Sequence, residues 1–202
     1  YFKRRGCSTK LKFKHNIKNK LSEMFVTSGS PLYKHVVNFI HQSWGSKDYF
    51  PGPQPISIEY KHFPILKKNE YVVCEKTDGE RHMMIATTFE GKPKCLFTNR
   101  AFDMFEVKIN LNKKAYEGTI LDGELYDNTL MVYDALLING QPVGHLNLYQ
   151  RLAEAEKFVK FIICMKFDKH RLKMKNFWAM KDFDHFMYQY LPTVEQKVDG
   201  LV

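Results

Sequence analysis

One short stretch of the chain combines the residue types that nucleotide chemistry requires. Residues 75–81 read EKTDGER and fall between two runs rich in β-forming residues. A lysine at such a junction, here Lys76, would be held rigidly, and its amine can act as a nucleophile once nearby cations or desolvation favour loss of its proton. Gly79 allows close backbone approach, and Arg81 offers a planar fork of donors for nucleotide oxygens. For this motif alone, an exposed polar turn is the alternative interpretation.

Three further segments follow in order along the chain. Residues 121–125 (LDGEL) bring two carboxylates near a turn, residues 133–136 (YDAL) join an aromatic ring to an acid, and residues 199–202 (DGLV) come last. Together with the KxDGxR motif, this series resembles the covalent nucleotidyltransferases, which comprise mRNA capping guanylyltransferases and ATP- or NAD-dependent polynucleotide ligases. The resemblance covers residues 51–202.

Several sequence strings favour the capping branch of that family over the ligases. They are the complete KxDGxR form, FPGPQPIS at 50–57, YDALLING at 133–140 and KMKNFW at 173–178. The resemblance implies a two-step reaction with GTP as substrate. Lys76 attacks the α-phosphate and releases pyrophosphate, and the resulting lysine–GMP phosphoramidate then passes GMP to a 5′-diphosphate RNA end. An ATP-using RNA or DNA ligase, or a non-catalytic RNA- or protein-binding domain of the same fold, is the alternative.

The resemblance also assigns roles around the base and the ribose. Arg81 and Glu124 would hold the ribose hydroxyls, and Tyr133 would stack on guanine as an aromatic platform. Lys175 would approach the base and donate to guanine O6. The competing interpretations are a hairpin acid for Glu124, a core aromatic for Tyr133 and an exposed strand face for Lys175.

The remaining assignments concern phosphates and metal. Arg100 resembles the family arginine that neutralises phosphate oxygens, although a surface arginine has the same appearance in the sequence. Asp199 would bind Mg²⁺ or Mn²⁺, because a transferring phosphoryl group needs a hard cation with oxygen ligands. Asp78, Asp122 and Asp134 are expected to orient neighbouring groups or to make structural bonds.

The elements that must position these residues follow from local patterns. Ser30 as N-cap and Pro31 at the first position predict a helix that stops at Gly45. A stiff proline-rich segment then leads into short strands separated by turns, and Asn147 caps a second helix. The fold class is therefore α+β, mainly antiparallel sheet with flanking helices, in a ligase-like nucleotidyltransferase domain. Strands are predicted over 71–75, 82–89, 94–98, 119–126 and 130–138, with a tight turn at 127–128 and a further helix around 183–191.

Two regions are expected along the chain. Residues 1–50 form a basic N-terminal segment plus a helix, and residues 51–202 form the nucleotidyltransferase domain, which is truncated at its metal-binding motif. The family's C-terminal OB-type barrel, and the lysine-containing segment before it, are absent from this chain. Because those groups would stabilise the transition state, we expect the fragment alone to be weak or inactive.

Charge is concentrated at one end of the chain. Of 31 Lys and Arg against 22 Asp and Glu, residues 1–20 hold eight cations and no acid. Such a segment attracts phosphates or an acidic protein face, although the alternation in residues 10–14 also fits a lysine-rich edge strand. The overall composition, with 44% hydrophobic and 26% charged residues, is that of a globular protein rather than a disordered one.

The cysteines indicate the kind of compartment in which the protein works. None of the four cysteines (Cys7, Cys74, Cys95 and Cys164) has zinc-ligand spacing. Cys74 and Cys164 lie in apolar runs, so we expect them to be small core residues with free thiols, as in a reducing compartment.

We expect an intracellular location, either the nucleus or a viral replication site, and no membrane association. Besides GTP and RNA, a triphosphatase or methyltransferase domain or an RNA polymerase is a possible partner.

Overall fold

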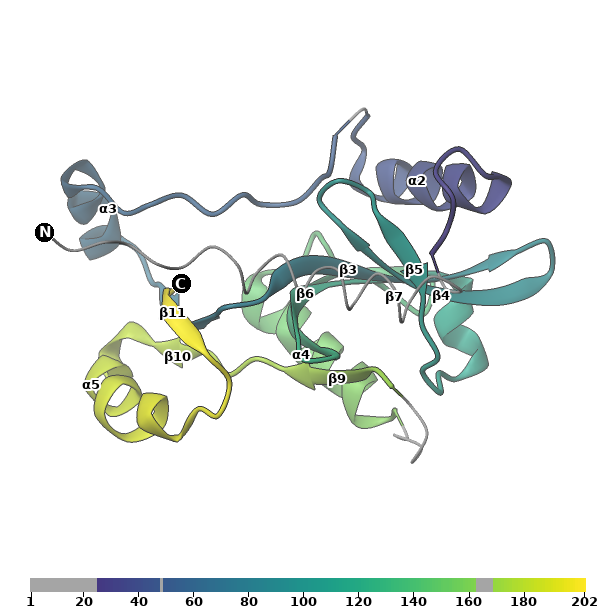
Figure 1. Cartoon of the computed structure of the whole chain (residues 1–202). Helices are drawn as coiled ribbons and strands as arrows, with labels where there is room; N and C mark the ends of the chain where they lie inside the picture. Colours follow the sequence, from purple (N-terminus) through teal and green to yellow (C-terminus); the bar gives the residue numbers. More distant parts are fainter. Residues whose placement is uncertain (1–24, 48, 163–168) are drawn as a thin grey trace, which may run out of the picture.

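A seven-stranded sheet forms the centre of the protein (Figure 1). The computed structural model describes residues 25–47, 49–162 and 169–202. The strand order is β5-β4-β3-β6-β7-β8, with β9 beside β7, and every pairing is antiparallel except β7 with β9. The strands are β3 (Glu80–Phe89), β4 (Lys92–Asn99), β5 (Met104–Glu106), β6 (Thr119–Tyr126), β7 (Thr129–Ile138), β8 (Gln141–Pro142) and β9 (Arg171–Met174). The predicted α+β class is confirmed.

Side-chain alternation along the strands gives the sheet two covered faces. On one face, residues such as Met84, Leu121 and Val132 pack against helix α4 (Leu148–Lys160). On the other face, residues such as Met83 and Ile120 pack against helix α2 (Pro31–Trp44), which runs above the sheet in Figure 1. The result is three layers, and α2 shares its core with the sheet.

The helix ends predicted for α2 and α4 are confirmed by their caps. The Ser30 hydroxyl accepts a hydrogen bond from the backbone N–H of Tyr33 at 3.2 Å, and Gly45 ends α2 with a left-handed φ of 64°. Asn147 begins α4 through a reciprocal capping box with Gln150.

The predicted turn between β6 and β7 is also present. Asp127 and Asn128 both adopt left-handed backbone conformations, with φ of 45° and 62°. Such a turn matches the twist of two antiparallel strands and therefore fixes their register. This register decides which side chains of β6 and β7 face each other.

Two small sheets and several short helices lie at one end of the large sheet (Figure 1). The helix expected around 183–191 is divided into short irregular turns, in which the rings of Phe183, Phe186 and Tyr190 pack in sequence. The small sheets pair β1 (Val72–Val73) with β10 (Trp178–Ala179) and β2 (Glu75–Thr77) with β11 (Val198–Leu201). The short helices at this end are η1 (Tyr60–His62), α3 (Phe63–Lys68), η3 (Met180–Asp182), α5 (Phe183–His185), η4 (Phe186–Tyr190) and η5 (Leu191–Thr193). A further short helix, η2 (Lys113–Glu117), lies elsewhere, against β3 and β4.

Some sequence predictions concern residues that the structure does not describe. The basic segment 1–20, Cys7 and Cys164 lie outside the described residues. Among the residues described, no helix combines the length and the apolar character needed to cross a bilayer.

Candidate active site

The predicted nucleophile and the predicted metal ligand lie side by side. Lys76 is on β2 and Asp199 is on β11, and these two strands pair with an irregular register. The Lys76 Nζ donates to Asp199 Oδ1 at 2.7 Å, while the two side chains remain 48% and 41% exposed. The pair is therefore formed but open to solvent, and a ligand can compete for either member.

Gly79 brings the motif turn directly against β6. A Cβ at this position would lie 2.5 Å from the Leu125 carbonyl oxygen and 2.9 Å from Glu124 Cγ, both closer than real Cβ atoms approach. Only glycine therefore fits here, which gives its place in KxDGxR a steric reason. The close approach puts Glu124 next to the lysine-bearing strand.

Glu124 is the acid around which the predicted cations gather. Burial raises the pKa of its carboxyl, and the positive charges of Lys175, Lys76 and Arg100 oppose that rise. Arg100 is exposed just after β4. The fold therefore brings one acid and three cations together from four separate parts of the sequence.

Arg81 and Tyr133 meet at a different carboxylate, that of Asp122. The Arg81 Nε and Nη2 donate to the Asp122 carboxylate at 3.1 and 2.5 Å, and the Tyr133 hydroxyl donates to the same carboxylate at 3.0 Å. The third donor of Arg81, Nη1, bonds the Pro53 carbonyl oxygen at 2.7 Å. The Arg81 guanidinium also lies over the ring of Phe50, 5.3 Å from its centroid.

This cluster is buried, and burial dominates its protonation chemistry. Burial raises the pKa of the Asp122 carboxyl against the opposing bonds from Arg81 and Tyr133, and burial with the nearby Asp122 charge raises the pKa of Tyr133. Burial alone would lower the pKa of Arg81, but the bond to Asp122 outweighs it and the pKa is raised. Arg81 is thus held as a guanidinium behind Glu124, its cross-strand partner. The ribose and stacking roles of Arg81 and Tyr133 stay predictions.

Lys175 is fixed by a residue that the sequence analysis did not single out, Glu75. The Lys175 Nζ donates to the Glu75 carbonyl oxygen at 2.5 Å and lies 4.0 Å from the Glu75 carboxylate. That carboxylate is fully buried, and Gln196 Nε2 donates to its Oε1 at 3.2 Å. Its Oε2 has no hydrogen-bond partner among the described residues. An acid directly after the apolar run of 72–74 was the available signal for this buried group.

The described residues would bind magnesium only together with phosphate oxygens of a substrate. Within the described residues no cluster of three or more His, Cys, Asp or Glu side chains could hold a metal. Mg²⁺ is commonly bound by one or two carboxylates together with substrate phosphates and water. The half-exposed carboxylate of Asp199 fits that mode, whereas a metal cage made by the protein alone does not.

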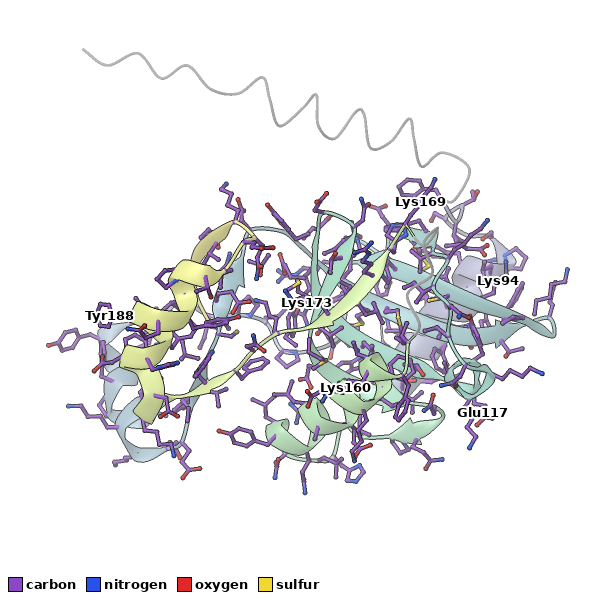
Figure 2. All side chains as sticks on the ribbon, turned by 90° about the horizontal axis from the view of Figure 1, so that it is seen from below. Lys94, Glu117, Lys160, Lys169, Lys173 and Tyr188 are labelled. Atoms are coloured by element: carbon purple, nitrogen blue, oxygen red, sulfur yellow. The ribbon has the colours of Figure 1, made fainter. Side chains whose placement is uncertain are left out.

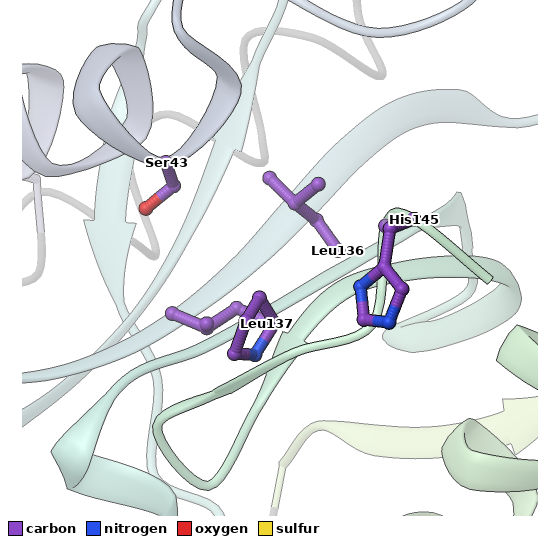
Figure 3. A pocket seen from close by; sticks show the side chains of 6 residues that line it. Ser43, Leu136, Leu137 and His145 are labelled. Atoms are coloured by element: carbon purple, nitrogen blue, oxygen red, sulfur yellow. The ribbon is translucent and has the colours of Figure 1, made fainter.

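Two cavities lie away from Lys76. One, of about 350 Å³, is lined by apolar side chains with Ser43 and His145 at its rim (Figure 3). The other, of about 370 Å³, lies between α4 and the segment joining β9 to β10, and Lys175 contributes to its wall. Neither is lined by Lys76 or Asp199, so the candidate site lies outside both of these cavities.

Comparison with known proteins assigns the family. The sequence model of the mRNA capping enzyme catalytic domain matches residues 12–202. The chain belongs to the mRNA capping enzyme family. The capping branch suggested by the four motifs is thereby confirmed.

Individual capping enzymes are similar over much of the chain. An mRNA-capping enzyme of Danio rerio is 28% identical over 181 residues, covering 76% of this chain and 29% of the relative. An mRNA-capping enzyme subunit alpha of Neurospora crassa is 24% identical over 183 residues, covering 76% of this chain and 46% of the relative. The corresponding subunit of Schizosaccharomyces pombe is 38% identical over 91 residues, covering 40% of this chain and 23% of the relative. The capping-enzyme chain thus spans less than half the length of each.

Proposed function

We propose that this chain carries the guanylyltransferase chemistry of mRNA capping, with Lys76 as the nucleophile toward GTP. The observation that supports this most directly is the 2.7 Å contact between Lys76 Nζ and Asp199 Oδ1 in a capping-enzyme chain, with both side chains half exposed. A lysine held by a single open contact can be released to a substrate, whereas a lysine buried in an ion pair cannot.

The first step consumes GTP. The neutral Lys76 amine forms a bond to the α-phosphorus, and the bond from that phosphorus to the oxygen bridging the β-phosphate breaks, which releases pyrophosphate. The amine gives up its proton before attack, and Asp199 is the carboxylate within hydrogen-bond distance of it. The product is a lysine–GMP phosphoramidate.

The second step transfers GMP to RNA. A terminal β-phosphate oxygen of a 5′-diphosphate RNA attacks the same phosphorus, the phosphorus–nitrogen bond breaks and the lysine amine takes up a proton. Dividing the transfer lets one site handle a small triphosphate first and a long polyanion second.

The surrounding residues hold the nucleotide in this proposal. Glu124 accepts from ribose hydroxyls with Arg81 behind it, Tyr133 provides an aromatic platform for guanine, and Lys175 donates to the base. Arg100 neutralises phosphate oxygens from the exposed rim. Mg²⁺ or Mn²⁺, held by Asp199 and the substrate phosphates, would offset the charge that develops on the leaving pyrophosphate.

Cell location and partner proteins are also proposals. The buried Cys74 and Cys95 are free thiols, and burial raises the pKa of these thiols to about 11 and about 12, which keeps them unreactive. Such thiols support a reducing, intracellular compartment, either the nucleus or a viral replication site. A triphosphatase or methyltransferase domain or an RNA polymerase would supply or receive the RNA end.

The test is covalent labelling with GTP radiolabelled at the α-phosphate. We expect Mg²⁺-dependent, acid-labile labelling of the longest natural polypeptide that contains this chain, weak or no labelling of the chain alone, and no labelling after Lys76→Ala. Lys113→Ala, on η2, is the matched control and should label normally. Labelling that survives in Lys76→Ala, or that prefers ATP to GTP, would contradict the proposal.

A further inference from the structure

The outermost strand on one side of the sheet, β9, carries two cations on a single face. Among the described residues β9 pairs only with β7, so it forms an edge. Leu172 and Met174 pack into the core shared with α4. Because neighbouring side chains on a strand point to opposite faces, Arg171 and Lys173 point away from that core, and both are exposed.

That second face is the face of the candidate active site. Strand register places Arg81, Glu124, Met131 and Lys173 in one row across β3, β6, β7 and β9. Lys173 therefore stands two strands beyond Glu124, at the open end of the row. Lys175, the next residue of the same alternation, reaches the Glu75 carbonyl oxygen inside the site.

A second row ends on the other cation. Tyr126 is paired with Thr129, and Thr129 is paired with Arg171, across β6, β7 and β9. Lys169 comes just before β9, and Figure 2 shows Lys169 near the start of this strand and Lys173 farther along it. The cations thus form a line that leads along β9 toward the residues around Lys76.

These two cations lack an ion-pair partner within the described part of the chain. No ion pair joins Arg171 or Lys173 to an acid there, whereas Lys94, Lys157 and Lys160 are each bonded to a glutamate. Positions two apart on a strand are separated by about 6.6 Å, a spacing of the same order as that of phosphates along an extended single strand. Unpaired cations in such a line are suited to a polyanion.

We propose that the β9 edge, defined by Arg171 and Lys173, binds the phosphate backbone of the single-stranded RNA acceptor and leads its 5′ end to Lys76. This inference rests on the proposed guanylyltransferase function, and it locates that function's second substrate. GTP itself needs neither residue, because the cations near Glu124 are Lys76, Lys175 and Arg100. The β9 edge should therefore affect the second step and leave the first step unchanged.

The experiment compares two double variants that remove the same charge. Arg171→Gln with Lys173→Gln changes the β9 edge, and Lys113→Gln with Lys114→Gln changes exposed lysines of η2, next to the far end of β3. Binding of a short 5′-diphosphate single-stranded RNA is followed by fluorescence anisotropy across a salt series. We expect the β9 variant to lose about tenfold in affinity at low salt and its salt slope to fall by about 1.4, since each phosphate contact contributes about 0.7. The η2 variant should remain within twofold of the parent.

Labelling separates failure of this inference from failure of the proposed function. If lysine–GMP forms normally in both variants but GMP transfer to RNA is slow only in the β9 variant, the inference is supported. Equal losses of RNA affinity in the two variants would overturn it, as would a loss of GTP labelling in the β9 variant. A β9 variant that becomes oligomeric by size-exclusion chromatography while binding RNA normally would also overturn it, because the cations would then serve to block edge pairing. Absence of GTP labelling in the longest natural polypeptide that contains this chain would instead refute the proposed function.

Discussion

Two ion pairs at the same end of the sheet differ in almost every physical respect. Arg81 and Asp122 form a double contact, their side chains are only 6% and 5% exposed, and Tyr133 adds a further bond. Lys76 and Asp199 form a single contact with both side chains nearly half exposed. The buried pair cannot be exchanged for a ligand without leaving a charge unpaired, whereas the exposed pair can.

The buried pair supports the fold, whereas the exposed pair is the one that a ligand can reach. Strand register places Arg81 beside Glu124 and Met83 beside Asp122, so the buried pair fixes the strands that carry the site. The exposed pair lies on the short strands β2 and β11, where its side chains are accessible to a ligand. The comparison predicts that changes to the buried pair act on folding and that changes to the exposed pair act on activity.

The largest expected effect is at the buried pair. Asp122→Ala leaves Arg81 buried without its carboxylate, and we expect the free energy of unfolding to fall by about 3–5 kcal/mol. Urea denaturation followed by circular dichroism measures this change. Replacing both partners, as in Arg81→Met with Asp122→Leu, should recover part of the loss because no charge remains unpaired. A loss below about 1 kcal/mol in Asp122→Ala would remove the contrast between the two pairs.

A smaller effect of opposite sign is expected at Glu124, which lies between the two pairs. Its pKa is raised in the folded protein, so ionisation of Glu124 above that pKa opposes folding. Glu124→Gln should therefore increase the free energy of unfolding at pH 7 by up to about 1 kcal/mol, a modest value because solvent screens a half-buried group. The gain should disappear as the pH falls through the raised pKa, where the parent glutamate also becomes neutral.

The same variant tests whether Glu124 serves the nucleotide. GTP labelling should fall in Glu124→Gln even though the protein is more stable, because a neutral amide is a weaker acceptor for ribose hydroxyls. Thermal unfolding at pH 4 and pH 7 and labelling at pH 7 measure the two effects on one sample. A variant that is stabilised and fully active would show that the acid has no role in the site.

The smallest expected stability effect is at the exposed pair. Asp199→Ala should change the free energy of unfolding by about 0.5 kcal/mol or less, since exposed ion pairs contribute little. Its GTP labelling should nevertheless fall strongly and should respond weakly to added Mg²⁺. Lys197→Ala, which removes another exposed ion pair on the same segment, is the control for a general effect on β11. Normal labelling in Asp199→Ala would contradict the metal role.

Local patterns predicted most of the large sheet. Alternating strands, the turn at Asp127 and Asn128, and the caps at Ser30 and Asn147 depend on neighbouring residues, so they can be recognised in the sequence. The parallel pairing of β9 with β7 and the short pairing of β2 with β11 depend on partners far away in the chain. No local signal specifies such partners. The spacing of the aromatic residues predicted a helix around 183–191 but not its division into short turns.

The motifs identified candidate site residues one by one but did not indicate the contacts among them. The motifs identified Lys76, Glu124 and Asp199, which the fold brings to one end of the sheet. They did not show that Asp122 is the carboxylate that Arg81 and Tyr133 share. Asp122 stands two positions after the buried Ile120 on β6, so its side chain points to the same buried face. An acid on a buried face indicates a hydrogen-bonded partner. Identifying that partner required the register of three strands.

The pairing of β2 with β11 has a consequence for the order of events during folding. Lys76 and Asp199 are 123 positions apart, whereas the β3–β4 and β6–β7 hairpins join neighbouring segments. Closing so long a loop costs more chain entropy than closing a hairpin, and non-local contacts form slowly. We expect the central sheet to appear first in kinetic experiments and Lys76, the proposed nucleophile, to acquire its carboxylate neighbour last, so that the proposed site is completed only after the chain is compact.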